Sequence, residues 1–452
     1  MQLKDLIESI KPVAVRGSVQ REITGITTDP RQVRAGGLFF ALGDLKQGNH
    51  TMAIENAIRR GAIGIVAENE EAVPYKATNI QVTSSRKAWL EATRAFYGNP
   101  AERLSKIAIQ GEESETTPVA WYLKELLSLA GEKAGWYGHS RCDFGTRTVP
   151  LIKDESRLLK CDQYYAQMLH EGCKAVVVEA SSRDFLDSDQ FDYIFNTTEG
   201  LSDFAVVQMG DETAVHAGPT CYVLAEKIRY FRDHTHCTLI SSDIISTVAL
   251  PFSGRSNLLS FLKACTALLK TGMMLNPGVL KHIIPCPGLR EHFQAPGCPS
   301  VYVDGAKGAG LIQLLLKELG ELHPKRIVMV GGATGEMTAQ ERRDLGTVAA
   351  GLTDFCYLTS DNPGQHSPSR IAAEVAQGFG SKFHGYKIVP DRKQAIAEAI
   401  AKGGPEDIVV VTGKGIQAVQ MMEDSVIPFD DRQVVREQLE TNSKRQEMTV
   451  TS

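Results

Sequence analysis

Residues 110–117 could form a loop that binds phosphate, but their charge is the opposite of what such a loop needs. They read Gln-Gly-Glu-Glu-Ser-Glu-Thr-Thr, follow an apolar run at 107–109 and precede a helical pattern from Val119. A strand, a tight turn and a helix N-terminus form the usual setting of a phosphate-binding loop. Such a loop needs glycines, so that backbone N–H groups can surround the anion, and a Lys that reaches the terminal phosphates.

This loop has one Gly, no Lys and three Glu. Two like charges ~4 Å apart repel by ~4 kcal/mol at an effective dielectric of about 20, so we expect the loop to reject ATP. The alternative is a plain strand-to-helix connection, in which the helix dipole favours the acidic residues. From the loop alone, the plain connection is the preferred interpretation.

Three turns in the last third of the chain could also line a ligand site. They are 331–332 (Gly-Gly), 360–364 (Ser-Asp-Asn-Pro-Gly) and 412–415 (Thr-Gly-Lys-Gly), and each follows an expected strand. Ligands bind outside the carboxyl ends of the strands in open α/β sheets, so three such turns favour a ligand cleft over simple strand ends. The His-Thr-His-Cys run at 234–237 lacks a partner cluster, and we interpret it as a surface group rather than a metal site.

Short apolar strands alternate with helices along the chain, which predicts an α/β fold. A chain of 452 residues is too long for one core, and two or three domains are expected. Proline-containing breaks divide it into 1–104, 105–296 and 297–452, and the central block should hold a mostly parallel sheet covered on both faces. The expected strands are 23–27, 37–42, 64–67, 79–82, 107–109, 174–179, 193–196, 238–241, 300–303, 326–330, 355–359, 387–388 and 407–411. The expected helices are 50–60, 85–97, 155–171, 256–269, 310–319, 340–352, 368–378 and 392–401.

The composition is that of an ordinary globular protein, with 42% apolar and 23% charged residues and a net charge of −5. No long run of one sign is present, so neither nucleic acid nor an anionic membrane is an expected partner. No apolar stretch is long enough for a membrane span, and the N-terminus resembles an amphipathic helix rather than a signal peptide. The nine cysteines are scattered, which favours thiols in a reducing cytoplasm.

Several short motifs follow one another along the chain. They are Asp-Pro-Arg at 29–31, Gly-Gly-Leu-Phe-Phe-Ala-Leu at 36–42, Gly-Asn-His at 48–50, Ala-Ile-Arg-Arg-Gly-Ala at 57–62, Ser-Asp-Asn-Pro at 360–363, Asp-Arg at 391–392, Gly-Lys-Gly at 413–415 and Phe-Asp-Asp-Arg at 429–432. Their order resembles that of the Mur ligase family over nearly the whole chain. The similarity is strongest to the E-type branch, which adds the third amino acid to UDP-N-acetylmuramoyl-dipeptide.

The resemblance implies a three-domain α/β architecture: a small N-terminal domain for the uridine nucleotide, a central P-loop-like domain with a mostly parallel sheet, and a C-terminal Rossmann-like domain. It implies that ATP phosphorylates the substrate carboxylate and that an amine then displaces phosphate. The residues that it places at the substrate are Asp29, Arg31, His50, Ser181, Asp361, Asn362, Pro363 and Lys414. Those that it places at the nucleotide are Gly111, Glu115, Thr116, Thr117, Asp304 and Arg342, those at a metal are Thr116 and Glu179, and those at the catalytic centre are Glu179, Glu226 and Lys227.

The chain departs from the family pattern at several of these positions. Glu115 stands at the phosphate-loop Lys, and Glu226 stands at a Lys that the family carbamylates, with Lys227 beside it. A solvated helix face is the preferred interpretation of this Glu-Lys pair. Gly364 stands at the Arg that holds the carboxylate of the incoming amino acid, and Gly cannot make that bidentate contact. Gln417 replaces the Glu that meets its ammonium.

These departures predict a catalytically degenerate homologue, without enzymatic activity, that binds, scaffolds or regulates near cell-wall precursor synthesis. Its expected partners are UDP, a UDP-N-acetylmuramoyl peptide or other cell-wall synthesis proteins, its expected location is the cytoplasm, and no cofactor or metal is expected. One alternative is a diverged but active ligase that uses ATP and Mg²⁺ and draws on Glu179, Glu226, Lys227, Asp304, Lys307 and Lys414. A third possibility is a protein that binds only a UDP-sugar.

Overall fold

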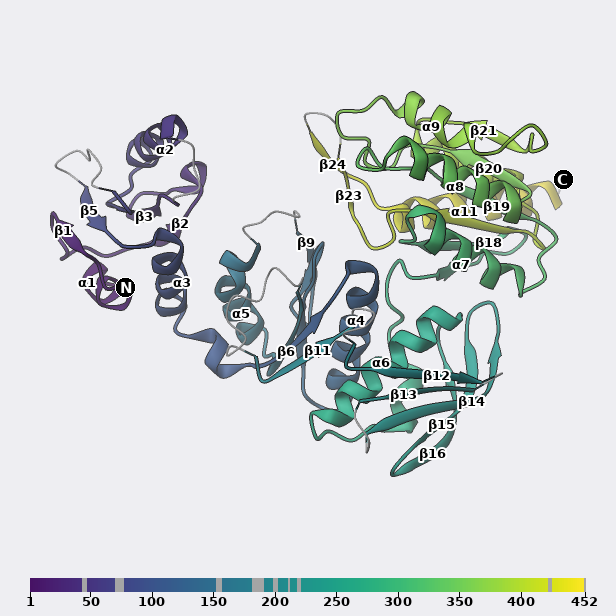
Figure 1. The fold of residues 1–452 in the computed structure, drawn as a ribbon, viewed down its shortest axis with the longest axis horizontal. Coiled ribbons are helices and arrows are strands. Elements are labelled where there is room, and N and C mark those ends of the chain that lie inside the picture. The colour runs from purple at the N-terminus through teal and green to yellow at the C-terminus, as the bar shows by residue number, and fades with distance from the viewer. Residues whose placement is uncertain are drawn as a thin grey trace. The chain divides into compact units, whose positions relative to one another are not determined.

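The computed structural model describes residues 1–42, 47–69, 77–151, 157–180, 191–197, 202–209, 212–217, 221–421 and 425–450. It confirms the predicted α/β architecture, with three domains and mixed sheets (Figure 1). The chain divides into two compact units, 1–106 with 153–176 and 107–152 with 177–452. The boundaries after residues 104 and 296 remain predictions. Within the described ranges, no helix combines the length and the apolarity that crossing a membrane requires.

The N-terminal sheet has five strands in the order β1-β5-β4-β3-β2, and only β1 is antiparallel to its neighbour. Successive side chains of β3 point to opposite faces, so Phe40 packs with Leu3 and Trp89 while Phe39 packs with Ala57. Helices therefore cover both faces. The elements are α1 (Leu3–Ile10), β1 (Ala14–Arg16), β2 (Gly25–Thr27), η1 (Pro30–Gln32), β3 (Gly37–Phe40), α2 (Gln47–Arg59), β4 (Gly64–Ala67), β5 (Thr78–Gln81), α3 (Ser85–Phe96) and η2 (Pro100–Arg103).

A later segment, η3 (Arg157–Lys160) with α5 (Cys161–His170), belongs to the same compact unit as the N-terminal sheet. The indole Nε1 of Trp89 donates to the carbonyl of Leu159 at 2.6 Å, and the hydroxyl of Thr93 donates to Asp162 at 3.0 Å. Both donors are on α3, so α3 holds this segment.

The central domain is built on two sheets, and only one was predicted. The first has the order β11-β6-β10-β7-β8-β9, in which β11 is parallel to β6 and the β7–β9 strands form an antiparallel meander. Helix α4 packs on β7 and on α6. The elements are β6 (Ser105–Gln110), α4 (Glu113–Leu129), β7 (Ala134–Tyr137), β8 (Arg141–Asp143), β9 (Thr148–Pro150), β10 (Ala175–Ala180), β11 (Tyr193–Asn196), α6 (Arg255–Lys270) and η5 (Pro277–His282).

The second sheet corrects the prediction of a mostly parallel central sheet, because β12–β16 form an antiparallel meander (Figure 1). Glu226 and Lys227 lie in β14, so their interpretation as a helix face is wrong. Burial alternates along β14, with Val223 and Ala225 buried, and this period of two is the signal of a strand. The strands are β12 (Ala205–Met209), β13 (Glu212–His216), β14 (Tyr222–Tyr230), β15 (Thr235–Ser241) and β16 (Ile244–Leu250).

The third domain has a six-stranded sheet in the order β17-β18-β22-β19-β20-β21, parallel except for β17. The carboxyl ends of β18, β22, β19 and β20 meet at one edge, and the turns at 331–332, 360–364 and 412–415 follow three of these strands. Separate apolar cores lie on the two faces. The elements are β17 (Glu291–Phe293), β18 (Ser300–Asp304), α7 (Gly308–Gly320), β19 (Ile327–Gly331), α8 (Ala339–Leu352), β20 (Phe355–Leu358), α9 (Pro368–Gln377), β21 (Tyr386–Ile388), α10 (Arg392–Lys402), β22 (Ile408–Thr412), β23 (Val419–Met421), β24 (Val426–Pro428) and α11 (Asp431–Val450).

Candidate functional site

The 110–117 loop has the predicted strand–turn–helix form. Gly111, at φ +147°, leads from β6 into α4, and its N–H donates to the carbonyl of Ala180 at 3.2 Å. The N–H groups of Glu115 and Thr116 both donate to the carbonyl of Glu112 at 2.9 Å. Because the helix begins at once, these two N–H groups already have acceptors.

Glu179, at the end of β10, is completely buried against this loop. Its Oε2 accepts hydrogen bonds from the hydroxyls of Thr117 at 2.8 Å and Thr116 at 3.2 Å. Its Oε1 accepts from the indole Nε1 of Trp136 at 2.7 Å, and Nε2 of His139 lies 3.7 Å from Oε2. The loop and the β7–β8 turn thus converge on one carboxylate.

This set of oxygen atoms fits a magnesium ion that arrives with a phosphate. Mg²⁺ is usually held in proteins by one or two carboxylates together with substrate phosphates and water. Glu179 would supply the carboxylate, and the hydroxyls of Thr116 and Thr117 would supply neutral oxygens. No group of three or more His, Cys, Asp or Glu among the described residues could hold a metal by itself, so the remaining ligands would come from the substrate and water.

Lys263, a cation on another helix, interacts electrostatically with Glu115 of the loop. The helices α4 and α6 pack together, and the hydroxyl of Tyr122 donates to Asn257 Oδ1 at 2.7 Å. On α6, burial lowers the pKa of Lys263, and the charge of Glu115 acts in the opposite direction. Oε2 of Glu115 is buried and has no hydrogen-bond donor among the described residues. Sequence reasoning missed Lys263, since no local motif marks it.

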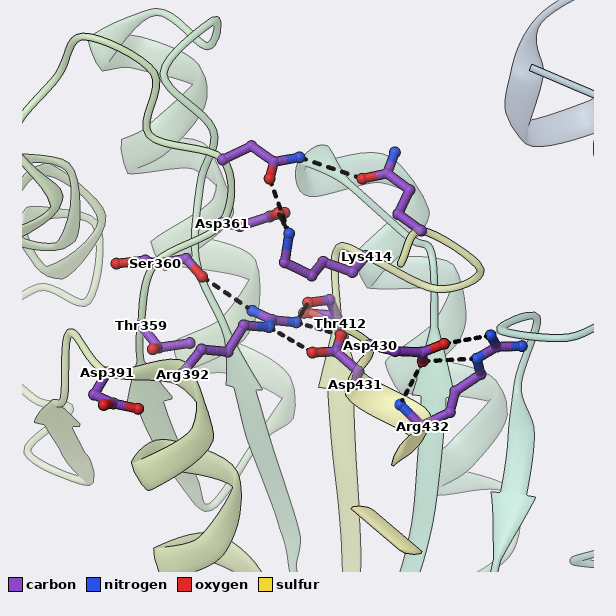
Figure 2. Close-up of polar contacts among 12 residues, drawn as sticks. Thr359, Ser360, Asp361, Asp391, Arg392, Thr412, Lys414, Asp430, Asp431 and Arg432 are labelled. Atoms are coloured by element: carbon purple, nitrogen blue, oxygen red, sulfur yellow. Dashed lines mark hydrogen bonds and ion pairs between the residues drawn. The ribbon is translucent and has the colours of Figure 1, made fainter. Parts of the chain in front are cut away.

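In the third domain, Asp361 and Asn362 both lie beside Lys414, and Figure 2 labels Asp361 and Lys414. Lys414 Nζ donates to Asn362 Oδ1 at 2.8 Å and to the carbonyl of Val419 at 2.9 Å, and it lies 3.8 Å from Asp361 Oδ1. Burial lowers the pKa of Lys414 to about 8. Both carboxylate oxygens of Asp361 are buried without a hydrogen-bond donor in the described chain. Gln417 accepts from Asn362 Nδ2 at 3.2 Å.

Arg392 connects the strand ends at this edge by hydrogen bonds, although it was not predicted as a site residue. Its Nε and Nη2 donate to the two carboxylate oxygens of Asp431, each at 2.7 Å, and both side chains are buried (Figure 2). Nη2 also donates to the carbonyl of Thr412 at 2.7 Å, and Nη1 to that of Ser360 at 3.4 Å. One guanidinium thus joins the ends of β22 and β20.

The unusual pKa of Lys414 predicts a specific pH dependence of stability. The folded-state value of about 8 lies below the ordinary 10.5, so the unfolded chain binds more protons between these values and stability rises with pH across that window. The free energy of unfolding of the wild type, relative to Lys414→Met, should rise by up to about 3 kcal/mol from pH 8 to 10.5. Urea unfolding at several pH values measures this, and a difference that does not change with pH would refute it.

Two further predicted residues of the third domain, Asp304 and Arg342, have structural partners. Asp304 accepts from the N–H groups of Arg290 and Ala306, each at 2.7 Å, and burial raises its pKa to about 6. Arg342 pairs with Glu374 at 2.6 Å and donates to two carbonyls of the 334–335 turn. That turn also packs against Pro363, whose carbonyl would clash with a Cβ on Gly335.

The predicted substrate residues of the N-terminal domain lie on neighbouring elements, because η1 packs against α2. Asp29 caps η1 and binds the largely exposed side chain of Arg31 through both carboxylate oxygens, at 3.0 Å each. His50 is half-buried on α2.

Two predicted residues of the central domain remain. Lys227 is at φ +54° in a bulge of β14 beside Glu226. Ser181 lies outside the described residues.

A comparison with protein families and a comparison with known sequences both find similarity to ligases. The family described as "Mur ligase, glutamate ligase domain" matches residues 291–415. A UDP-N-acetylmuramoyl-L-alanyl-D-glutamate–2,6-diaminopimelate ligase of Caldanaerobacter subterraneus subsp. tengcongensis is 26% identical, covering 98% of this chain and 100% of that protein. The enzyme of that name from Solibacter usitatus is 29% identical, covering 97% of this chain and 98% of its own length.

Solved structures show the same fold. A structure of a UDP-N-acetylmuramoyl-L-alanyl-D-glutamate–2,6-diaminopimelate ligase matches with a TM-score of 0.55 and 19% identity, covering 97% of this chain and 99% of that one. MurF from Acinetobacter baumannii matches with a TM-score of 0.61 and 15% identity, covering 98% of each chain. At these identities the structural matches support the fold alone.

Proposed function

Because the chain belongs to the Mur ligase family, we propose that it is an ATP-dependent ligase of peptidoglycan precursor synthesis. It would join the carboxylate of a UDP-N-acetylmuramoyl peptide to the amine of an amino acid. The observation that carries this proposal is the coverage of named ligases along almost their whole length. The convergence of Thr116, Thr117 and Glu179 at the loop supports it.

The prediction that the chain is not an enzyme is contradicted by these relatives. Sequences that align with nearly all of it carry the names of ligases. The prediction rests on individual residue replacements, and these leave out the charges that other elements bring to the loop, such as that of Lys263.

The proposal assigns separate tasks to the two clusters. Glu179 and the two threonine hydroxyls would hold Mg²⁺, which neutralises charge on the transferring phosphate. The edge formed by Asp361, Asn362 and Lys414 would hold the incoming amino acid, whose amine attacks the activated carboxylate. A buried carboxylate without hydrogen-bond donors, such as that of Asp361, is an acceptor for an ammonium group.

The proposal changes the expected cofactors. In place of the prediction that the chain needs no cofactor, it requires ATP and Mg²⁺. A UDP-N-acetylmuramoyl peptide remains the proposed partner, and a cytoplasmic location and further cell-wall proteins remain predictions.

Calorimetric titration of the full chain tests the two binding steps separately. One titration uses ATP with Mg²⁺, a second uses UDP-N-acetylmuramoyl-L-alanyl-D-glutamate, and UDP alone is the control for the nucleotide part of the second. The proposal expects both ligands to bind, with ATP binding dependent on Mg²⁺. Binding of the UDP-peptide without any binding of ATP would instead identify a UDP-sugar-binding protein. Failure of both to bind would contradict any role in this reaction.

A further inference from the structure

A second charged cluster joins Arg141, at the start of β8, to the Phe-Asp-Asp-Arg motif at 429–432. Arg141 Nη2 donates to Asp430 Oδ2 at 3.1 Å. Arg432 binds the same carboxylate through two nitrogens, with Nε at 2.9 Å and Nη2 at 2.6 Å (Figure 2). The carboxylate of Asp430 therefore accepts hydrogen bonds from two guanidinium groups.

The second carboxylate of the cluster, Glu291, accepts its hydrogen bonds from donors other than Arg141 and Arg432. It accepts from Arg436 at 3.1 Å and from the N–H of Gly288 at 2.9 Å. The nearest nitrogen of Arg432 is 3.8 Å from it, which is beyond hydrogen-bond distance. Three guanidinium groups thus share two carboxylates, which leaves an excess positive charge within the part of the cluster that the structure describes.

Arg141 has a hydrogen-bond donor without an acceptor in the part of the chain that the structure describes. Its Nε is buried and has no acceptor among the described residues. Burial, and then the nearby charge of Arg432, lower the pKa of Arg141. A buried donor without a partner costs about 1–3 kcal/mol, and more when it is charged, so an anion that reaches this group would be bound favourably.

The cluster lies next to the proposed magnesium site. Arg141 and His139 belong to the same β7–β8 turn, and His139 is the residue 3.7 Å from Glu179. The N–H of Gly138 donates to the carbonyl of Arg141 at 2.9 Å, which closes the turn. A Cβ on Gly138 would lie 2.8 Å from Glu179 Oε1, so the turn sits directly against this carboxylate.

We propose that Arg141 and Arg432 form a binding site for a phosphate group, and that they supply the positive charge that the 110–117 loop lacks. A guanidinium presents its donors in a planar fork that matches the oxygens of a phosphate. The inference rests on the proposed function for the source of the phosphate, which would be the nucleotide or the activated carboxylate. Binding of phosphate itself requires no turnover.

The test is calorimetric titration of the full chain with inorganic phosphate, and with acetate at the same ionic strength. We expect Arg141→Gln to weaken phosphate binding by about tenfold or more, the loss of one charge-assisted contact. Arg436→Gln is the matched control, because Arg436 is an exposed member of the same cluster, and it should retain the wild-type affinity. If the Arg141→Gln variant does not fold, Arg141→Lys is the substitute. It keeps the positive charge but lacks the planar pair of donors, so it should also weaken phosphate binding.

Three results would overturn the inference: a wild-type chain that does not bind phosphate, an Arg141→Gln variant that binds it as tightly as the wild type, and acetate that binds as tightly as phosphate. The last result would identify a general carboxylate site. These results are separable from failure of the proposed function, because a chain that forms no amide can still bind phosphate in a manner that depends on Arg141.

Discussion

Replacing Asp431 with Asn is expected to lower the free energy of unfolding of the third domain by about 3–5 kcal/mol. The carboxylate binds Arg392 through both oxygens, and the two side chains are 0% and 1% exposed. Removing the negative charge leaves a buried guanidinium without its hydrogen-bonded ion-pair partner, which is far more costly than losing an exposed pair. The carbonyls of Thr412 and Ser360, which Arg392 also binds, remain but cannot neutralise it.

Hydrogen exchange of the amides of β22 measures this effect, because all three tryptophans lie before residue 137 and do not report on the third domain. Lys393→Ala is the control. Lys393 pairs with Glu437 across the same two helices, but these side chains are 57% and 44% exposed, so the change should cost no more than about 1 kcal/mol. Equal effects of the two substitutions would contradict a dominant role of the buried pair.

Replacing Glu179 with Gln is expected to reduce the rate of amide formation by about a hundredfold or more. A bound metal ion contributes several kcal/mol of charge stabilisation in such reactions, and each 1.36 kcal/mol changes the rate by about tenfold. Gln retains the size of the side chain and an oxygen for the indole of Trp136, but it removes the charge that would hold Mg²⁺. The measurement is the initial rate of product formation at saturating Mg²⁺.

Glu125→Gln separates this effect from damage to the fold. Glu125 is a buried carboxylate on α4 that pairs with Lys124 at 2.7 Å, and Lys124 keeps a second partner, Asp143, at 3.1 Å. We expect the Glu125 variant to retain most of the rate. If Glu179→Gln is as active as the wild type and melts at the same temperature, Glu179 has no part in catalysis.

The fold could be predicted where one physical signal dominated. The buried strand β4 and the partly buried strand β11 have the predicted bounds, because a short apolar run between turn residues is a clear strand signal. Helix α4 begins at Glu113, ahead of the helical pattern at Val119, and it includes Pro118. Acidic residues at a helix N-terminus favour this early start, but a proline inside the first turns conceals it from pattern reasoning.

The candidate site was predicted only where its residues are close in sequence or belong to one sheet edge. The grouping of Asp361, Asn362 and Lys414 follows from parallel strands that end together. Arg141 and Lys263 come from a hairpin and from a distant helix, and nothing in the spacing of the sequence marks them. The charge around the 110–117 loop therefore cannot be predicted from the loop alone. The prediction of an inactive protein, which also rests on Glu226, Gly364 and Gln417, is contradicted by the relatives.

The most direct test of the ligase function is detection of the product by mass. The full chain is incubated with UDP-N-acetylmuramoyl-L-alanyl-D-glutamate, ATP, Mg²⁺ and a mixture of amino acids, and the UDP-peptides are analysed by mass spectrometry while released phosphate is counted. A parallel reaction with a related ligase confirms that the substrates are competent. The account predicts a UDP-peptide heavier by one amino acid minus water, with one phosphate released for each product. A complete absence of this product, while the related ligase forms it, would contradict the account.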